Sequence, residues 1–183
     1  MISPIQKQLM AWIGVTLLSI QSTETVIQLC IACVLPTSPN YTWEMLGTRQ
    51  QQLRTKTLGH LLYEMRRRLK IIPHFEDILA KYLEMRNTFV HNVDEVPGWS
   101  LNSDEGIAAA HSFLTELLRL NETVQAVFLG LLSAWQDENS MHIEVSGMPE
   151  RGKRYFEHIN ATYKPLVDEI FFEKEDDNQT TKH

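Results

Sequence analysis

The sequence predicts an all-α protein, an up-and-down bundle of four long helices with one or two short C-terminal helices. Apolar residues recur at steps of three and four over long stretches, and no segment alternates apolar and polar residues for long enough to build a sheet. The chain has 183 residues, of which 43% are hydrophobic and 22% charged, which suits one globular domain. We expect a single helical domain over residues 1–172 and a polar, frayed tail over 173–183.

The first two helices are expected over Ile5–Val34 and Arg49–Ile71. In both segments large apolar residues return about once per helical turn, which is typical of a helix with one buried face. The loop between them starts at Pro36, where proline, serine and asparagine cluster.

Two further long helices follow. Pro73 suits the first turn of the third helix, which we expect to run to about His91. For the fourth helix, Asn102 is the expected N-cap, with Glu105 completing a capping box, and the periodic pattern continues to about Asp137.

The C-terminal third is less regular. Met141–Val145 fits a short strand or an extended loop, while Arg151–Asn160 and Tyr163–Phe172 fit short helices.

The apolar N-terminal segment resembles a targeting or membrane segment only superficially. Its uncharged run, from Gln8 to Thr23, is shorter than the roughly 20 apolar residues that a membrane span needs. The helical pattern also continues past any cleavage site that a signal peptide would have. Cys30 and Cys33 lie in the same pattern, which favours buried thiols over a redox pair or a zinc site. We expect a cytoplasmic protein without membrane contact.

Common catalytic motifs are absent from the sequence. It holds no GxGxxG, GxxxxGK[ST], HExxH or GxSxG pattern, and no Glu-x-x-His pairs of the di-iron type. We expect neither a metal nor a cofactor.

The charge is unevenly distributed. The formal net charge is −6, yet Arg49–Lys70 holds seven basic residues against one acid, so this segment is +6 and the remainder −12. A solvated helix face is one interpretation, and a phosphate-contacting strip is the other. The candidate RNA-binding residues of this basic strip are Arg66, Arg67, Arg68 and Lys70.

The third helix carries the clearest functional signal. Arg86 falls on its core-facing stripe between Tyr82 and Phe89, where a guanidinium needs a charge partner, a subunit interface or a ligand phosphate. Asn87 and His91 share a face one turn apart. Arg86 and His91 are separated by about 140° around the helix. We therefore expect two copies of the helix, packed face to face, to present both groups better than one copy does.

The segment Arg86-Asn87-Thr88-Phe89-Val90-His91 resembles the Arg-(four to six residues)-His motif of the HEPN superfamily (higher eukaryotes and prokaryotes nucleotide-binding). The preceding segment Thr57-Leu58-Gly59-His60-Leu61 is similar to a TLG-x-L stretch in several members. The resemblance implies a helical bundle that dimerises through the motif helices. Many members are metal-independent endoribonucleases of toxin–antitoxin, phage-defence or CRISPR-associated systems, and others bind nucleotides or RNA without catalysis.

The residue types fit metal-free RNA cleavage. In this reading His91 moves a proton, Arg86 stabilises charge on the phosphorane, and Asn87 orients the imidazole or the phosphate. The expected partners are a second copy of the chain, an RNA substrate, and an antitoxin or other partner protein. The alternative is a non-catalytic helical module that binds a nucleotide, RNA or a protein, and the third reading is a bundle in which the Arg-x4-His spacing is accidental.

Overall fold

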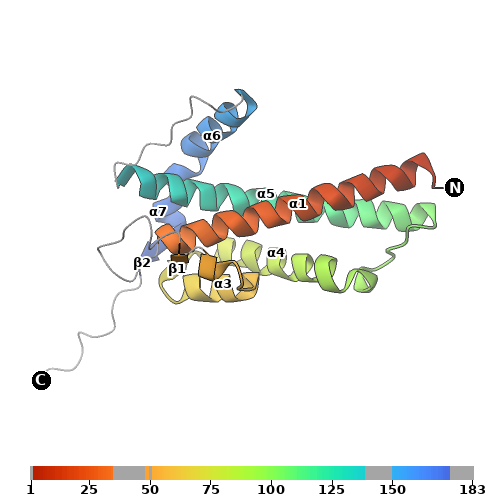
Figure 1. Ribbon diagram of the computed structural model, residues 1–183, viewed down its shortest axis with the longest axis horizontal. Coiled ribbons are helices and arrows are strands. Elements are labelled where there is room, and N and C mark those ends of the chain that lie inside the picture. Colours follow the sequence, from red (N-terminus) through yellow and green to blue (C-terminus); the bar gives the residue numbers. More distant parts are fainter. Residues whose placement is uncertain (1, 35–47, 50, 139–149, 174–183) are drawn as a thin grey trace, which may run out of the picture.

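The computed structural model describes residues 2–34, 48–49, 51–138 and 150–173, and within them the chain is all-α, as predicted. Three long helices pack together: α1 (Pro4–Cys33), α4 (Pro73–His91) and α5 (Asp104–Glu138). Figure 1 shows that α1 and α5 run in the same direction and that α4 runs against them. The first, third and fourth predicted helices thus lie within two residues of their expected bounds.

The second predicted helix is wrong in its length. Instead of a helix through Ile71, the structure has the nine-residue helix α3 (Leu58–Arg66), followed by the strand β1 (Leu69–Ile71). The residue before a proline avoids helical dihedrals, and Ile72 before Pro73 is accordingly extended. The bundle therefore has three long helices and the short α3, not four long ones. Because α1 and α5 run in the same direction, the predicted up-and-down order of the first and fourth helices is also wrong.

The C-terminal part begins with α6 (Glu150–Thr162), close to the prediction. The second short helix expected here is broken: a 3-10 turn η3 (Lys164–Leu166) leads into the four-residue α7 (Val167–Ile170) and then β2 (Phe171–Glu173). β2 pairs antiparallel with β1, with Ile71 opposite Phe171. The predictions for Met141–Val145 and for the tail beyond residue 173 fall outside the described residues.

Helix termini are set by local hydrogen bonds. Ser3 and Gln6 form a reciprocal capping box at the start of α1, with Pro4 in the first turn. At the start of α5 the Ser103 hydroxyl accepts the Gly106 amide, so Ser103 caps this helix, not Asn102 as expected.

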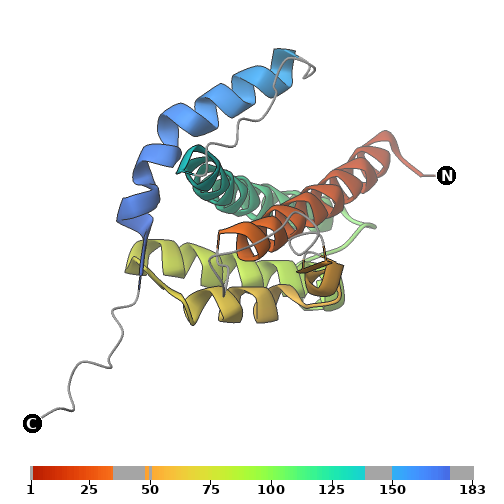
Figure 2. The ribbon, with the colours of Figure 1, turned by 60° about the vertical axis from the view of Figure 1, so that its left-hand side comes forward.

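The core lies between α1, α3, α4 and α5. A cluster of three aromatic rings, Phe75, Phe128 and Phe171, joins the start of α4 to α5 and β2, with ring centroids 5.7–6.4 Å apart. Seen from the second direction in Figure 2, α6 projects away from this core, while α1, α4 and α5 remain together.

Two features of α1 concern its cysteines and its apolar length. Cys30 and Cys33 are free thiols. Cys30 is buried, donates a hydrogen bond to the Phe128 carbonyl, and has its pKa raised by burial, whereas Cys33 is half-buried and not fully buried as expected. By length and hydropathy α1 is the one helix among the described residues that is able to cross a membrane. Core helices of soluble proteins also reach these values, and the buried face of α1 lies against α5.

Candidate functional site

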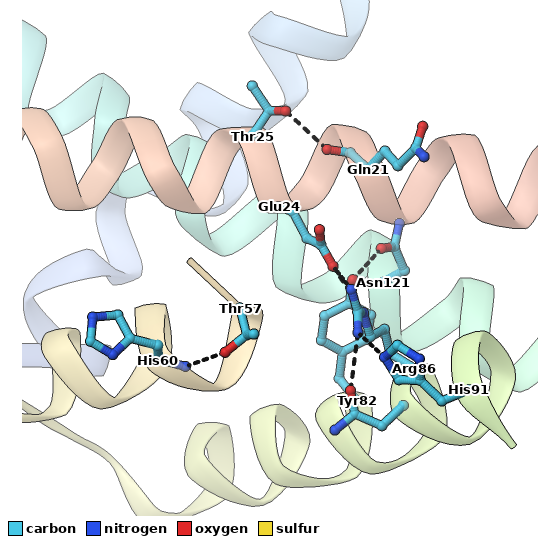
Figure 3. Close-up of polar contacts among 10 residues, drawn as sticks. Gln21, Glu24, Thr25, Thr57, His60, Tyr82, Arg86, His91 and Asn121 are labelled. Carbon is cyan, nitrogen blue, oxygen red and sulfur yellow. Dashed lines mark hydrogen bonds and ion pairs between the residues drawn. The ribbon is translucent and has the colours of Figure 1, made fainter. Parts of the chain in front are cut away.

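The motif residues meet at the C-terminal end of α4. Arg86 Nη1 lies 3.1 Å from Asn87 Oδ1 and 3.5 Å from His91 Nε2. The expectation that one helix would hold Arg86 and His91 apart is therefore wrong, because the long arginine side chain spans the angle between them. A guanidinium only donates, so an attractive contact requires the lone pair on Nε2 and the ring proton on Nδ1. One protomer thus presents both groups together, as Figure 3 shows.

Glu24 of α1 is the charge partner of Arg86. Arg86 Nε and Nη2 lie 2.9 and 2.6 Å from Glu24 Oε1, and the two side chains are only 16% and 22% exposed. The sequence allowed a charge partner, a subunit interface or a ligand phosphate for this arginine. The structure provides a charge partner from the same chain. Because Nε and Nη2 are committed to Glu24, Nη1 is the nitrogen that faces Asn87 and His91.

A buried polar pair lies beneath this ion pair. The Tyr82 hydroxyl, one turn before Arg86, donates a 2.8 Å hydrogen bond to Asn121 Oδ1 of α5. Burial raises the Tyr82 pKa, and the nearby Glu24 carboxylate raises it further, while Arg86 acts in the opposite direction. Tyr82 therefore stays protonated as a donor, and Figure 3 shows that residues from α1, α4 and α5 converge here.

A cavity of about 350 Å³ opens over the motif. One side is formed by Arg86, Asn87, His91 and Asn92, and the other by Thr57, Leu58 and Gly59 at the start of α3. The two segments that carried the family resemblance are thus the two walls of one cavity.

On the α3 side of the cavity, the polar groups are backbone amides of the first helical turn. The Thr57 side chain caps α3 by accepting the His60 amide at 3.3 Å, and a Cβ built on Gly59 would meet nothing within 4 Å. The first turn of a helix has amides without helical partners, which suit an anion. Together with Nη1 of Arg86, the cavity offers donors and an imidazole, the chemistry that a phosphate requires.

The basic strip does not reach this cavity. Arg66 pairs with Glu76, while Arg67 and Arg68 lie 3.4 and 4.0 Å from Glu64. These arginines stand at the opposite end of α3 from Thr57, about 13 Å along the helix axis. Lys70 is exposed on β1. The structure therefore brings together Arg86, Asn87 and His91 but leaves the four strip residues apart from them, with their charge partly offset.

Sequence reasoning missed Glu24 and Asn121. Glu24 had a usable signal, because Lys7 and Glu24 are the only charged residues of α1, and a lone carboxylate in an apolar helix suits a lone arginine on another core stripe. Asn121 is 1% exposed in the middle of α5, and its position in the apolar pattern marks a polar group that needs a partner.

Within the described residues no group of three or more His, Cys, Asp or Glu side chains is arranged to hold a metal ion. No family model, curated protein or solved structure matches the chain.

Proposed function

We propose that this chain is a metal-independent endoribonuclease of the HEPN type. The observation that carries the proposal is the cavity in which Arg86 Nη1, the Asn87 amide and His91 Nε2 face the N-terminus of α3. In this proposal α1, α3, α4 and α5 correspond to the four helices of such a bundle, with α3 shortened.

The chemistry follows from the two side chains. The His91 Nε2 lone pair accepts the proton of an RNA 2′-hydroxyl, whose oxygen attacks the adjacent phosphorus. Arg86 Nη1 donates to a non-bridging oxygen as negative charge builds on the phosphorane. The bond from phosphorus to the 5′-oxygen breaks, and the imidazolium returns its proton to that oxygen. The products are a 2′,3′-cyclic phosphate and a 5′-hydroxyl.

Glu24 supports this role by fixing the guanidinium. It occupies Nε and Nη2, which leaves Nη1 for the phosphate and holds the planar group in one orientation. Asn87 accepts from the same Nη1 at 3.1 Å and contributes orientation, not proton transfer.

The test is cleavage of a single-stranded RNA by purified protein in EDTA. His91→Ala is expected to lower the cleavage rate about 10²–10⁴-fold, the contribution of a positioned acid–base group. Arg86→Lys is expected to lower it about 10²–10³-fold, as for the loss of one oxyanion donor. His74→Ala is the matched control, since His74 is an exposed histidine at the other end of α4 and is expected to leave the rate unchanged.

Three results would contradict the enzyme proposal: loss of cleavage in EDTA, equal rates for His91→Ala and His74→Ala, or cutting of a DNA of the same sequence. Circular dichroism of each variant separates catalytic from folding defects. The same proposal includes a biological role as a toxin or phage-defence effector. It predicts growth arrest on expression, which His91→Ala relieves.

A non-catalytic module that binds RNA, a nucleotide or a protein is the second candidate. The observation that favours it is the charge outside Arg49–Lys70, a net −12 that repels bulk RNA. Binding of the RNA without turnover, weakened by Arg86→Lys and indifferent to His91→Ala, would support it. The cytoplasmic location, the antitoxin and the homodimer through α4 stay predictions.

A further inference from the structure

A second cavity lies between α5 and α6 and has a volume of about 470 Å³. Three aromatic rings line it, those of Tyr155 and His158 on α6 and of Tyr163 just after that helix. Figures 1 and 2 show α4 and α6 on opposite sides of α5, and no residue lines both this cavity and the one over the motif. We call this space the aromatic cavity, and it is separate from the proposed RNA site.

The rings of the aromatic cavity are held in place by the packing of α6 on α5. Ile159 is fully buried, and the Ser133 hydroxyl of α5 donates a 2.5 Å hydrogen bond to Asn160 Oδ1. The rings of His158 and Tyr163 lie 5.9 Å apart between centroids, with their planes at 87°. Two nearly perpendicular rings form a corner in which a ligand meets the face of one ring and the edge of the other.

The charges along the aromatic cavity leave one carboxylate uncompensated. Arg119 lines the cavity, but its Nε and Nη2 lie 2.9 and 3.0 Å from the carboxylate oxygens of Glu116. Glu122 also lines it, and no ion pair of Glu122 is found within the described ranges of the chain. Burial raises the Tyr155 pKa, and Glu122 and Tyr163 raise it further, so these three groups lie close together. The cavity therefore presents negative charge beside aromatic rings.

We propose that the aromatic cavity binds a small organic cation that carries a primary ammonium group, a property separate from RNA cleavage. Aromatic faces attract cations through the ring quadrupole, and a tyrosine ring does so well. An ammonium group also donates three hydrogen bonds. The Glu122 carboxylate, the Ser19 hydroxyl and the Tyr155 oxygen line the cavity as acceptors. The net charge of the chain, −6, attracts cations from a distance.

An anionic ligand is the main alternative, because Arg119 is a lining residue. Its guanidinium is already engaged by Glu116, which is also bound by Lys81 at the surface. An anion in the aromatic cavity would in addition meet Glu122 without a counter-ion. The charge pattern thus favours a cation.

Three probes of similar size and different charge test the proposal: n-butylammonium, n-butanol and butyrate. Each is titrated into the full-length protein at constant ionic strength, and backbone amide shifts are followed by NMR. The cation is expected to shift the amides of residues 119–126 and 155–163 saturably. It is expected to bind at least about tenfold more tightly than the neutral or anionic probe, since about 1.4 kcal/mol of charge-dependent attraction corresponds to tenfold. No RNA is present, so the outcome is independent of the proposed activity.

Two matched pairs of variants assign the contacts. Glu122→Gln is expected to weaken n-butylammonium binding about tenfold, whereas Glu157→Gln makes the same charge change at an exposed position of α6 outside the cavity and is expected to leave binding unchanged. Tyr155→Leu removes a ring and is expected to weaken binding more than Tyr155→Phe, which keeps it. Circular dichroism is expected to be unchanged in all four, because Glu122, Glu157 and Tyr155 are exposed.

The proposal is overturned if n-butanol or butyrate binds as tightly as n-butylammonium, or if Glu122→Gln and Glu157→Gln have equal effects. Equal binding by Tyr155→Leu and Tyr155→Phe would overturn the role of the ring. Tetramethylammonium has no N–H group and is expected to bind more weakly than n-butylammonium. Tighter binding of tetramethylammonium would overturn the primary ammonium and make a quaternary ammonium the ligand.

Discussion

Arg86 is held in place by a carboxylate 62 residues earlier in the chain. Both side chains are mostly removed from water, so each charge depends on the other for compensation. The Tyr82–Asn121 hydrogen bond beneath them adds a neutral polar link between α4 and α5. Arg86, which we propose contacts an RNA phosphate, is thus also part of the structural contact between α1 and α4.

The ion pair predicts a measurable coupling. Glu24→Gln and Arg86→Gln are each expected to lower the free energy of unfolding by about 1–3 kcal/mol, because each leaves a partly buried charge unpaired. The double variant is expected to lose less than the sum of the two, with a coupling of about 1–2 kcal/mol. Urea unfolding of the four proteins measures this cycle, and additive losses would show that the pair contributes no net stability.

At this scale the sequence named the three local side chains but not their contact. Arg86, Asn87 and His91 lie within six consecutive positions, yet helix geometry places Arg86 and His91 about 140° apart, and the reach of one long side chain joins them. Glu24, Thr57 and Asn121 come from three other segments. Their approach depends on how α1, α3 and α5 pack, and no periodicity within a single helix encodes that.

Among the elements, long periodic segments were predicted well and short ones poorly. α1, α4 and α5 each repeat their apolar stripe over several turns, and their bounds were close. α3 has only about two and a half turns, and the short segment Leu69–Ile72 after it is equally compatible with a strand. Pairing with β2, a tertiary contact, decides the outcome.

Gly130 shows how close contacts between elements constrain the sequence. A Cβ at this position would lie 3.0–3.1 Å from the backbone of Tyr163 and Lys164, where η3 crosses α5. A glycine within a helix costs about 1 kcal/mol relative to alanine, and the close approach of η3 gives Gly130 a packing reason.

We predict that Gly130→Ala lowers the free energy of unfolding by about 1–3 kcal/mol, because the added methyl group pushes η3 away from α5. Gly106→Ala is expected to cost more, since its Cβ would lie 2.3 Å from Ser100 Cβ. Gly14→Ala is the control, with open space around the new Cβ, and is expected to add about 0.5–1 kcal/mol through helix propensity. Thermal and urea unfolding rank the three, and equal stabilisation by all three would contradict the packing at both sites.

For the whole molecule, the charge distribution limits how the proposed RNA substrate would be held. Outside Arg49–Lys70 the chain carries a net charge of −12, and three of the four basic-strip residues have carboxylate neighbours within the chain. The strip and Arg86 together provide five cations. The proposed RNA binding would therefore rest on few phosphate contacts, so discrimination between RNAs would arise at the cavity more than from general electrostatic attraction.

This predicts a shallow salt dependence of RNA binding. Five phosphate contacts on a single strand give a slope of log K against log salt no steeper than about −3.5. Fluorescence anisotropy over a salt series measures it, and the double reversal Arg67→Glu with Lys70→Glu is expected to weaken binding and flatten the slope. A steeper slope would require a basic surface beyond these residues, and an unchanged affinity in the double variant would make the strip a solvated face.

The small β1–β2 ladder has a consequence for the order in which the molecule is assembled. Leu69 pairs with Glu173, about a hundred residues later, and the Ile72 amide donates to the Ile170 carbonyl just before α4 begins. During synthesis α1, α4 and α5 emerge before the partner strand exists, so the bundle has time to form first. Closing so long a loop is entropically costly, which makes the ladder a late step. In the nascent protein the motif helix α4 therefore forms early, and the β1–β2 contact next to the start of that helix forms last.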